Sequence, residues 1–335
     1  MAETVIEAKN LKKWFPLKTG FLSSIIRKQL FVKAVDDVSF SIAKGEIFGL
    51  AGESGSGKTT TGRLLIKLIE PTSGKITFNN VDITKISESN FKSYRKKLQI
   101  VFQDPYESLN PRMTINAIIN EPLQVHGIHD EKELGKIAYK ALEDVKLVPP
   151  EEFLQRYPHE LSGGQRQRVA TARALTLNPE FIVADEPVSM LDVSIRAEVL
   201  NLILELREKY RVSFLLITHD LAVARHMCDR IAVMYLGKMM EVADADNLVE
   251  EPLNPYTIAL INAVPVPDPT EKRINVVIKG EIPSPVNPPS GCHFHTRCPS
   301  YIGDICRTKE PPLIEVGKNH YVACHLFGSE KQPLT

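Results

Sequence analysis

The sequence predicts an α/β fold with a parallel sheet, and three apolar segments carry that prediction. Residues 45–51, 181–184 and 212–217 are short apolar runs with the length expected of buried strands. Helical spacing of apolar residues follows the first run, over residues 59–68, and a helical segment separates the other two. Strands that alternate with helices along a chain form parallel α/β sheets. The 335 residues are more than one average domain needs and suggest two.

A glycine-rich loop joins the first predicted strand to its helix. Residues 52–59, Gly-Glu-Ser-Gly-Ser-Gly-Lys-Thr, fit the pattern G-x-x-x-x-G-K-[ST]. Glycines let backbone N–H groups surround phosphates, and the following helix presents its positive dipole end to them. We expect Lys58 to reach the β- and γ-phosphates of ATP and the Thr59 hydroxyl to bind Mg²⁺. The other residues expected to contact ATP from this loop are Gly52, Ser54, Gly55, Ser56, Gly57 and Thr60.

The segments around this core have different patterns. The first 50 residues are rich in strand-forming patterns, including the alternation over residues 35–42, and residues 74–83 pass through an Asn-Asn turn that indicates a hairpin. The stretch from about 104 to 178 is mostly helical in pattern and is interrupted by prolines. We therefore expect an antiparallel β subdomain and a helical subdomain.

Two acidic residues follow the second predicted strand. Asp185 and Glu186 lie at its carboxyl end, where the ligand sites of open α/β sheets gather. We expect Asp185 to help hold Mg²⁺ and Glu186 to polarise an attacking water, although an acidic pair can also simply face solvent. His219 ends the next strand at the same edge. A histidine there is more often structural, but this position brings it into the candidate site.

A second candidate anion site begins another helix. Residues 161–165 read Leu-Ser-Gly-Gly-Gln, in which Ser162 can cap the helix and Gly163 and Gly164 permit close approach to an anion. An ordinary helix cap is the alternative. Because a chain that surrounds its own triphosphate leaves little room for a second helix start on it, we expect this one to serve a partner's nucleotide in a closed dimer.

Composition excludes several classes of protein. Lys+Arg and Asp+Glu both number 41, so no basic excess points to nucleic acid. The N-terminal residues lack the pattern of a signal peptide, and no apolar run approaches the ~18 residues of a membrane span. We therefore expect a cytosolic, soluble chain, in which five cysteines indicate metal or cluster ligation better than disulfides.

Together these motifs resemble the nucleotide-binding subunit of an ATP-binding cassette (ABC) transporter, over roughly residues 1–260. The resemblance rests on residues 52–59, Gln103, residues 161–165, 181–186 and 189–192, and His219. It implies that Gln103 senses ATP by touching Mg²⁺ or the water, that Asp192 lies in a loop communicating across the dimer, and that His219 contacts the γ-phosphate. The implied catalytic set is Glu186, His219, Lys58 and Gln103. The implied contacts to the partner's nucleotide are Ser162, Gly163, Gly164, Gln165 and Asp192, and the implied Mg²⁺ ligands are Thr59, Gln103 and Asp185.

The resemblance also implies an aromatic residue stacked on adenine. Phe15 is the better match in this sequence and Trp14 the alternative, while edge-strand packing would explain either without a ligand. Residues 17–30 look like an insertion after this aromatic. Residues 102–114 are similar to peptide-transporter ATPases, in which this stretch grips the coupling helix of the membrane subunit.

Four cysteines lie near the C-terminus. Cys292, Cys298, Cys306 and Cys324 are separated by five, seven and seventeen residues, in a region that looks like the C-terminal module of oligopeptide and dipeptide transporter ATPases. Some members of that group hold a [4Fe–4S] cluster there, and four thiolates would complete one. Structural Zn²⁺ is the main alternative, although its usual C-x₂₋₄-C pairs are missing; free or disulfide-linked thiols are another.

Other candidate ligands are expected to be bystanders. His293, His295, His320 and His325 could replace cysteines as metal ligands, but we expect them to hydrogen-bond to sulfur or solvent instead. Cys228 falls in an apparently helical segment and is expected to be a small buried apolar residue.

The resulting prediction is a P-loop NTPase of the ABC ATPase fold that powers peptide uptake. Residues 1–264 would form the nucleotide-binding domain, with the helical subdomain at about 104–178, and residues 265–335 a Pro-rich linker and Cys-rich module. The expected partners are a second ATPase chain, with a heterodimer favoured over a homodimer, two membrane permease subunits and an extracytoplasmic binding protein. The chain would lie on the cytoplasmic face of the membrane.

Three alternatives stay open at this point. An importer of the same subfamily could carry oligosaccharides, because the binding protein and permeases select the substrate. The cysteine module could make the chain a redox- or iron-regulated ATPase outside transport. A cassette that remodels ribosomes or DNA typically has a second cassette or a long coiled-coil insertion, and neither is visible here.

Overall fold

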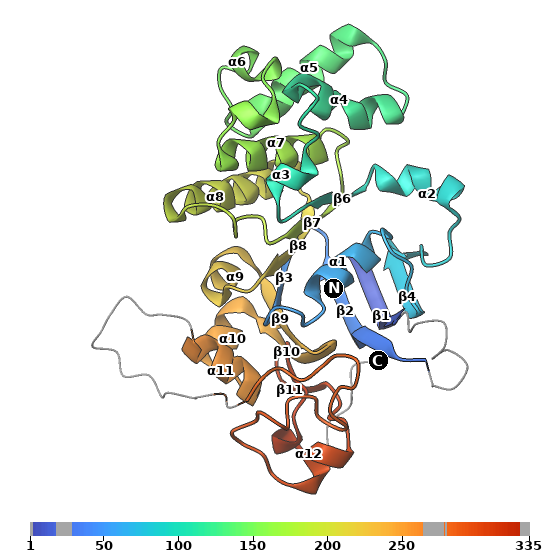
Figure 1. The fold of residues 1–335 in the computed structure, drawn as a ribbon, viewed down its shortest axis with the longest axis vertical. Coiled ribbons are helices and arrows are strands. Elements are labelled where there is room, and N and C mark those ends of the chain that lie inside the picture. The colour runs from blue at the N-terminus through green and yellow to red at the C-terminus, as the bar shows by residue number, and fades with distance from the viewer. Residues whose placement is uncertain (1–2, 18–28, 264–277, 279, 329–335) are drawn as a thin grey trace. The chain divides into compact units, whose positions relative to one another are not determined.

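The structure is a computed structural model that describes residues 3–17, 29–263, 278 and 280–328 (Figure 1). It divides into two compact units that are interleaved along the chain. The phosphate-loop unit comprises Ile6–Ser41, Ile47–Thr84 and Thr218–Thr335, and the helical unit comprises Met1–Val5, Ile42–Glu46 and Lys85–Ile217. Each unit has strands and helices of its own.

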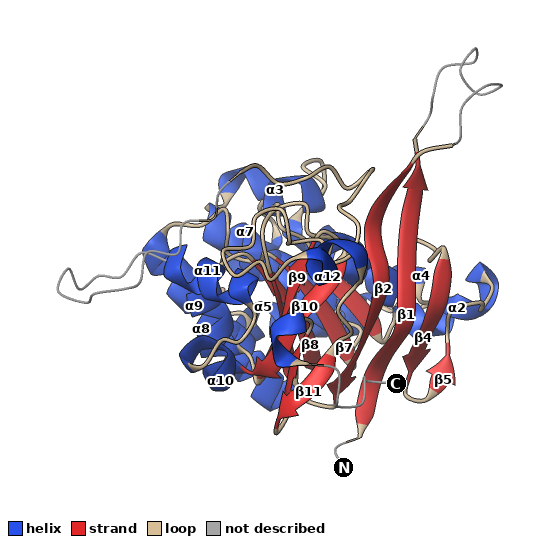
Figure 2. Cartoon of the chain, turned by 90° about the horizontal axis from the view of Figure 1, so that it is seen from below, coloured by secondary structure: helices blue, strands red, loops and turns tan. Residues whose placement is uncertain are grey.

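An antiparallel sheet forms one part of the phosphate-loop unit and is seen as long neighbouring strands in Figure 2. Its order is β2-β1-β4-β5, with β1 at Thr4–Pro16, β2 at Phe31–Ala43, β4 at Ser73–Phe78 and β5 at Val81–Asp82. The turn between β4 and β5 uses Asn79 and Asn80 at φ 47° and 65°, the left-handed backbone that tight hairpins require and Asn tolerates. The hairpin expected at residues 74–83 is therefore confirmed.

The second group of strands in this unit ends at β3. Its order is β11-β12-β10-β9-β3, and β3 pairs with β9 in parallel while the other pairs are antiparallel. The bounds are β3 Ile47–Ala51, β9 Arg230–Tyr235, β10 Lys238–Asp244, β11 Ile314–Gly317 and β12 His320–Val322. All five residues of β3 are buried, as the apolar run at residues 45–51 predicts. The helices of the unit are α1 Lys58–Leu65, α9 Leu221–Met227, α10 Ala245–Glu250, α11 Pro255–Ala263, α12 Asp304–Thr308 and the short 3₁₀ helix η2 His325–Phe327.

A buried polar network attaches the C-terminal hairpin to β10. The Glu241 carboxylate, fully buried, accepts hydrogen bonds from the backbone N–H groups of Leu253 (2.8 Å) and Asn254 (2.9 Å) and lies 2.7 Å from His320 Nε2. Asn254 Nδ2 donates to the carbonyls of Met240 and Ala323, both at 3.1 Å. Because buried polar groups are stable only when paired, these bonds specify where β12 lies against β10.

Parallel strands form the sheet of the helical unit. Their order is β8-β7-β6, with β6 at Leu98–Val101, β7 at Phe181–Asp185 and β8 at Ser213–Thr218. Ile182 of β7 lies between Gln99 of β6 and Phe214 of β8, and every residue of β7 and β8 is buried. The prediction of two buried parallel strands separated by a helix is therefore confirmed.

Helices make up the rest of the helical unit. They are α2 Glu88–Arg95, α3 Pro105–Ser108, α4 Ile115–Val125, α5 Glu131–Asp144, α6 Glu151–Leu154, η1 Pro158–Glu160, α7 Gly163–Leu175 and α8 Val193–Tyr210. The Thr114 side chain caps α4 by accepting from the Ala117 N–H, and Asp130 caps α5 in the same way from Glu133. The helical character expected at residues 104–178 is confirmed.

Several further expectations meet the structure at single positions. Cys228 is buried, and its sulfur lies so close to β3 that a Cβ added at Gly49 would be 2.8 Å from it. The predicted insertion at residues 17–30 falls mostly on residues 18–28, and the predicted domain boundary near 265 on residues 264–277, both outside the described residues. Along the part of the chain that the structure describes, no helix is long and apolar enough to cross a membrane.

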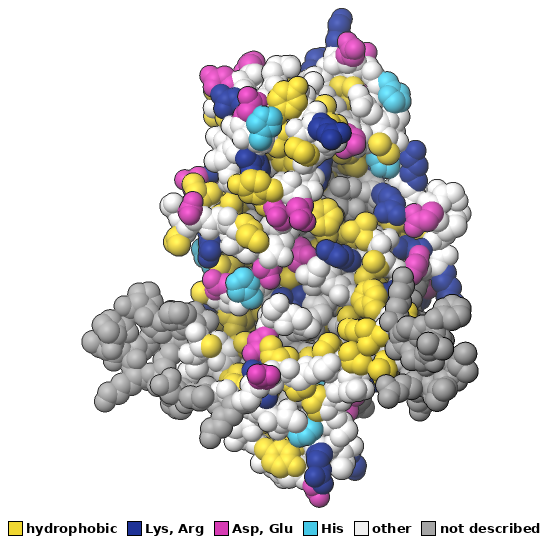
Figure 3. All heavy atoms as spheres, in the orientation of Figure 1, with side chains coloured by type: hydrophobic (Ala, Val, Ile, Leu, Met, Phe, Trp, Pro, Cys, Tyr) yellow, Lys and Arg dark blue, Asp and Glu magenta, His cyan; other side chains and the backbone are white. Residues whose placement is uncertain are grey.

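Charges of both signs are distributed over the surface. Figure 3 shows Lys and Arg side chains intermixed with Asp and Glu across the visible face. Ion pairs such as Lys146–Glu205 (2.6 Å) and Arg225–Glu250 (2.5 Å) join exposed side chains. Exposed pairs of this kind contribute at most about 1 kcal/mol each, so the buried strands dominate the stability.

Candidate functional site

The loop between β3 and α1 has a backbone that only glycine permits at two positions. Gly52 has φ +144°, and an added Cβ would lie 2.2 Å from the Met234 carbonyl oxygen. Gly57 has φ +108°, with the Ala34 carbonyl oxygen at the same 2.2 Å. The loop is therefore closely surrounded by backbone from β2 and β9, which explains two of its glycines without reference to a ligand.

Lys58 closes this loop from inside. Its Nζ donates hydrogen bonds to the carbonyls of Gly52 (2.7 Å) and Glu53 (2.9 Å), and the side chain is buried. Ser56 is also buried, and its carbonyl accepts from the Gly237 N–H at 2.9 Å. A buried ammonium requires such partners. Carbonyl oxygens of the loop thus hold the ammonium in place at the start of a helix. The positive charge and the helix N-terminus are the two features that suit an anion.

The remaining loop residues are more accessible. Ser54 and Gly55 are exposed at the tip of the loop, and Gly55 has φ +77° with nothing near its Cα that would meet a Cβ. Thr59 and Thr60 lie in the first turn of α1 and are partly exposed. The tip of the loop and the hydroxyls of Thr59 and Thr60 are therefore accessible, whereas Gly52, Gly57 and Lys58 pack against the rest of the unit.

The two candidate aromatic residues at the end of β1 have different surroundings. The Trp14 Nε1 donates to Asp36 (3.1 Å), and the Lys33 ammonium lies 4.7 Å from the Trp14 ring centroid. Phe15 is 38% exposed, and only the Lys13 ammonium is described near its ring, at 5.0 Å. Trp14 is therefore occupied by structural contacts, whereas Phe15 presents an accessible ring.

His219 belongs to the same unit as the phosphate loop. It follows β8 and is exposed, and the next residue, Asp220, caps α9 by accepting from the N–H groups of Ala222 (2.9 Å) and Val223 (3.2 Å). The cap holds the turn that carries His219.

The helical unit brings together two of the predicted residues. Gln103 Nε2 donates to the Glu186 carboxylate at 3.1 Å, although the two residues come from the ends of different strands, β6 and β7. Glu186 has φ +44°, an uncommon backbone for a residue with a side chain. Its carbonyl accepts from the N–H and hydroxyl of Ser189, at 3.2 and 3.1 Å, which secures that conformation. Asp185, the last residue of β7, is buried.

The helix start at α7 has a complete capping box. The Gln165 N–H donates to Ser162 Oγ (3.3 Å), and the Ser162 N–H donates to Gln165 Oε1 (3.0 Å). Gly164 is buried, and an added Cβ would lie 2.4 Å from Ile195 Cγ2 of α8, whereas Gly163 is partly exposed. The two glycines thus have different roles: Gly164 permits close packing of α7 and α8, and Gly163 keeps the helix start open.

Each unit therefore contributes its own part of the predicted set. The phosphate-loop unit contains Phe15, Gly52, Ser54, Gly55, Ser56, Gly57, Lys58, Thr59, Thr60 and His219. The helical unit contains Gln103, Ser162, Gly163, Gly164, Gln165, Asp185, Glu186 and Asp192, the last exposed at the start of α8.

Near the C-terminus, the four cysteines lie close enough to affect one another's thiol pKa values. Burial, with a smaller contribution from the negative charges of the other three thiolates, raises the pKa of Cys292 to about 12. Burial likewise raises the pKa of Cys298 to about 11, with Cys324 and Cys306 adding to the effect. The Cys292 N–H donates to the Cys306 carbonyl at 2.8 Å. Backbone N–H groups two residues further on, in Phe294, Ser300 and Leu326, donate to three of the sulfurs and oppose these shifts.

The described residues contain no group of three or more Cys, His, Asp or Glu side chains positioned to hold a single metal ion. The four histidines near the cysteines have other partners. His293 Nδ1 lies 2.9 Å from the Leu236 carbonyl, His295 Nδ1 2.8 Å from that of Cys292, and His325 Nε2 2.9 Å from that of Lys309, while His320 pairs with Glu241. They are hydrogen-bonding residues as expected, but their partners are backbone carbonyls and a carboxylate.

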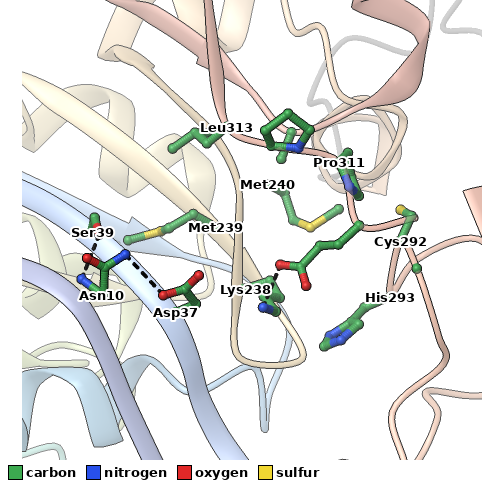
Figure 4. Close-up of a pocket in the computed structure, with 14 residues that line it drawn as sticks. Asn10, Asp37, Ser39, Lys238, Met239, Met240, Cys292, His293, Pro311 and Leu313 are labelled. Carbon is green, nitrogen blue, oxygen red and sulfur yellow. Dashed lines mark hydrogen bonds and ion pairs between the residues drawn. The ribbon is translucent and has the colours of Figure 1, made fainter. Parts of the chain in front are cut away.

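A cavity of about 200 Å³ lies beside Cys292 in the phosphate-loop unit (Figure 4). Its charged and amide side chains have partners: Lys238 pairs with Glu310 (2.5 Å) and with Asp36 outside the lining (3.4 Å), and Asn10 Nδ2 donates to Asp37 (3.2 Å). Met239, Met240 and Leu313 supply the apolar walls. This internal pairing explains the polar lining without a ligand.

One contact to the phosphate loop has no signal in the sequence. Arg297, beside Cys298, forms an ion pair with Glu53, the second residue of the loop, across 244 positions. Glu53 occupies a position at which the motif accepts any residue. No periodicity or motif connects the two, because tertiary packing alone brings them together.

Comparisons with known proteins agree with this geometry. Residues 35–189 match a family described as ABC transporter, and residues 240–306 match one described as oligopeptide/dipeptide transporter, C-terminal region. The chain is 52% identical to the oligopeptide transport ATP-binding protein AppF of Bacillus subtilis over 97% of this chain and 98% of that one. A dimeric post-hydrolysis structure of the ATP-binding cassette MJ0796 with ADP and Pi is 29% identical, with a TM-score of 0.61 over 72% of this chain and 98% of that one. The fold is also similar to cbiO1 from Clostridium perfringens, at 24% identity and a TM-score of 0.63 over 78% of this chain and 95% of that one.

Proposed function

We propose that this chain, which belongs to the ABC transporter family, is the ATP-hydrolysing subunit of an importer of di- and oligopeptides. The observation that carries the proposal is the order of matches in one chain: a nucleotide-binding cassette followed by the C-terminal region of oligopeptide and dipeptide transporters. The relative AppF is described as an oligopeptide transport ATP-binding protein and matches along nearly the whole chain. The C-terminal match favours peptides over oligosaccharides as the substrate, and it favours transport over other uses of the cassette.

ATP is bound by the phosphate loop. Its backbone N–H groups and the Lys58 ammonium would take the β- and γ-phosphates, so that Lys58 exchanges its carbonyl partners for phosphate oxygens. Phe15 stacks on adenine, which its exposed ring supports. Mg²⁺, held by Thr59, Asp185 and Gln103, would neutralise charge on the phosphates.

Hydrolysis depends on the helical unit. Glu186 orients and polarises the attacking water, and its hydrogen bond with Gln103 allows the glutamine to report whether nucleotide is present. His219 contacts the γ-phosphate and stabilises its charge during transfer. The Ser189 bonds that secure the Glu186 backbone support this role, because a base must be held in place.

The working unit is a dimer of cassettes closed around two ATP molecules. Ser162, Gly163, Gly164 and Gln165 contact the partner's nucleotide, and Asp192 lies in the loop between the two sites. The openness of Gly163 supports this contact, as does the dimeric state of the related cassette MJ0796. Loss of the γ-phosphate on hydrolysis removes a group held by both chains, so the dimer reopens. The partner chain is a related but different ATPase.

Two permease subunits and an extracytoplasmic binding protein complete the transporter, with this chain on the cytoplasmic face. The segment at residues 102–114 is the docking surface for the permease. Within it, Tyr106 is 61% exposed and is held by the Arg166 guanidinium, 3.8 Å from its ring centroid. Asp104 caps the short helix α3 by accepting from the Tyr106 N–H at 2.7 Å. A fixed, exposed aromatic on a capped turn is well suited to a partner surface.

The four C-terminal cysteines would hold a [4Fe–4S] cluster. Their mutual influence and the backbone N–H groups directed at three sulfurs fit a site for several thiolates, since such bonds accompany cluster ligands. Structural Zn²⁺ is the other metal that four thiolates could bind, and metal analysis distinguishes the two. When bound, the cluster would join loop-rich segments that have little secondary structure.

The cluster has a direct test. Cys298→Ser should lose bound iron and sulfide from anaerobically purified protein while ATP binding is retained. Cys228→Ser is the matched control, because Cys228 is buried elsewhere and should leave the metal content unchanged. Stoichiometric zinc in place of iron would overturn the proposal.

The transport role is tested in liposomes that contain the assembled complex. A binding protein loaded with peptide should raise the ATPase rate and drive peptide accumulation, and oligosaccharides should do neither. An ATPase rate that ignores the permeases and the loaded binding protein would contradict the proposal.

A further inference from the structure

The ion pair between Arg297 and Glu53 connects the cysteine-containing turn with the phosphate loop inside one unit. Arg297 Nη1 lies 2.9 Å from Glu53 Oε2, and Nη2 lies 3.2 Å from Oε1, so the guanidinium engages both carboxylate oxygens. The Arg297 side chain is only 9% exposed and that of Glu53 23% exposed. A bidentate pair with little exposure restrains orientation more than a surface ion pair does.

Every described polar group of Glu53 is occupied. Its carboxylate pairs with Arg297, its N–H donates to the Tyr256 hydroxyl (2.9 Å), and its carbonyl accepts from the Lys58 ammonium (2.9 Å) and the Ser56 N–H (3.2 Å). The peptide groups on both sides of Glu53 are thereby oriented. Because Lys58 is held by one of them, the position of Glu53 affects the position of the lysine.

Arg297 contacts a cluster of three packed aromatic rings. Tyr235, Tyr256 and Phe294 are all buried, with ring centroids 4.7 to 5.3 Å apart. Arg297 Nη1 also donates to the Tyr235 hydroxyl at 3.3 Å. Close-packed rings leave the guanidinium few alternative positions.

The arginine is part of the turn that carries two of the cysteines. The His295 N–H donates to the Cys292 carbonyl (3.0 Å), and the Arg297 N–H donates to the Phe294 carbonyl (2.9 Å). Arg297 immediately precedes Cys298. The conformation of the turn between Cys292 and Cys298 therefore determines the position of the Arg297 guanidinium.

We propose that Arg297 is a positioning residue for ATP binding: by holding both carboxylate oxygens of Glu53, it keeps the phosphate loop in the conformation that receives the triphosphate. The inference rests on the proposed function as an ATPase and extends it, because the C-terminal segment then acts on nucleotide affinity through this chain's own loop. Without the pair, the competent loop is one of several conformations. The apparent affinity for ATP is then the intrinsic affinity multiplied by the fraction of molecules with the competent loop. Saturating ATP shifts all molecules to that conformation, so the maximal rate is unchanged.

The test separates binding from chemistry in the assembled transporter. Arg297→Gln should raise the KM for ATP about tenfold and change kcat less than about twofold. Glu53→Gln should raise KM by a similar factor, and the double variant should match either single variant, because each breaks the same pair. Arg297→Lys, which keeps the charge but lacks the fork, should fall between wild type and Arg297→Gln.

The matched control is Arg307→Gln. Arg307 lies in the same C-terminal segment and pairs with Asp304 on the surface at 2.9 Å, far more exposed than Arg297. It should leave KM and kcat unchanged. Fluorescent nucleotide binding to each purified variant then reports the affinity without turnover.

The possible results distinguish a failure of the positioning role from a failure of the proposed ATPase function. A wild-type complex with no ATPase activity would contradict the proposed function. An active wild type with an unchanged KM in Arg297→Gln would overturn only the positioning role, as would a double variant whose effects multiply. If Arg297→Gln does not fold, Glu53→Gln, which leaves the buried arginine in place, decides the question by its KM. A variant that loses thermal stability yet keeps the wild-type KM would also overturn it.

Discussion

The two units use glycine at helix starts in different ways. In the phosphate-loop unit, Gly52 and Gly57 have positive φ values, and backbone carbonyls lie where a Cβ would go. In the helical unit, Gly164 is required because Ile195 of the next helix fills the space beside it, and Gly163 has no such contact within 3 Å. The loop before α1 is thus a cradle completed by its own unit. The start of α7 is an ordinary capped helix end, at which Ser162 is exposed and Gly163 partly exposed. Under the proposed function, ATP binding and contact with the partner chain should therefore respond separately to mutation.

The largest effect should come from Gly57→Ala. Position 57 has a φ of +108°, and the new Cβ would lie 2.2 Å from the Ala34 carbonyl oxygen. The loop must therefore change conformation, and ATP binding should fall below detection. Isothermal titration with ATP measures this. Gly135→Ala is the matched control, because Gly135 has ordinary backbone and no neighbour in its Cβ space, and that variant should bind ATP normally. Retained affinity in Gly57→Ala would remove the distinction between the two helix starts.

Next in size is Glu186→Gln in the helical unit. Loss of the carboxylate base should lower kcat by roughly 10²–10⁴-fold, while ATP affinity stays within about twofold. Steady-state hydrolysis and nucleotide binding, measured on the same preparation, check the two parts. An unchanged turnover rate would show that Glu186 is not the base.

Ser162→Ala should moderately lower stability and the hydrolysis rate of the dimer. Losing the cap should cost about 0.5–2 kcal/mol of stability. ATP affinity of the isolated chain should be unchanged. Hydrolysis by the assembled dimer should fall several-fold, because under the proposed function the start of α7 contacts the partner's nucleotide. Urea unfolding and the two activity assays give these numbers. Weaker ATP binding by the isolated chain would place Ser162 in the chain's own site.

The smallest effect should be that of Gly135→Ala on stability. Gly135 is exposed within α5, where alanine has the better helix propensity, so the free energy of unfolding should rise by roughly 0.5–1 kcal/mol. Chemical denaturation detects a change of this size. A loss of stability would mean that a glycine without contacts still has a structural role, against the contact-based account of Gly164.

Local patterns in the sequence predicted much of this molecule. The buried run before residue 52 became β3, the Asn-Asn turn became the β4–β5 hairpin, and Ser162 capped α7 as expected. These features depend on residues close together in the chain: strand-length apolar runs, turn residues that tolerate positive φ, and side chains that reach their own backbone. Such interactions repeat in every protein, so their patterns can be read without a structure.

Contacts across long stretches of chain could not be read in this way. Gly164 must be glycine because Ile195 of α8 fills the space beside it, and the hydrogen-bond partner of Gln103 is Glu186, at the end of β7. Three of the histidines beside the cysteines lie within hydrogen-bond distance of backbone carbonyls, and the fourth pairs with Glu241. In each case many residues of the right chemistry were available, and packing selected one.

The phosphate loop contains both kinds of information. Its residue types and spacing were sufficient to predict a strand, a phosphate-binding turn and a helix, because the backbone geometry of such a turn depends on glycines a few positions apart. Tertiary structure alone decided that Glu53 meets Arg297 from a turn between two cysteines. Pairing over 244 positions depends on where the intervening strands and helices pack, and no short-range pattern encodes that distance.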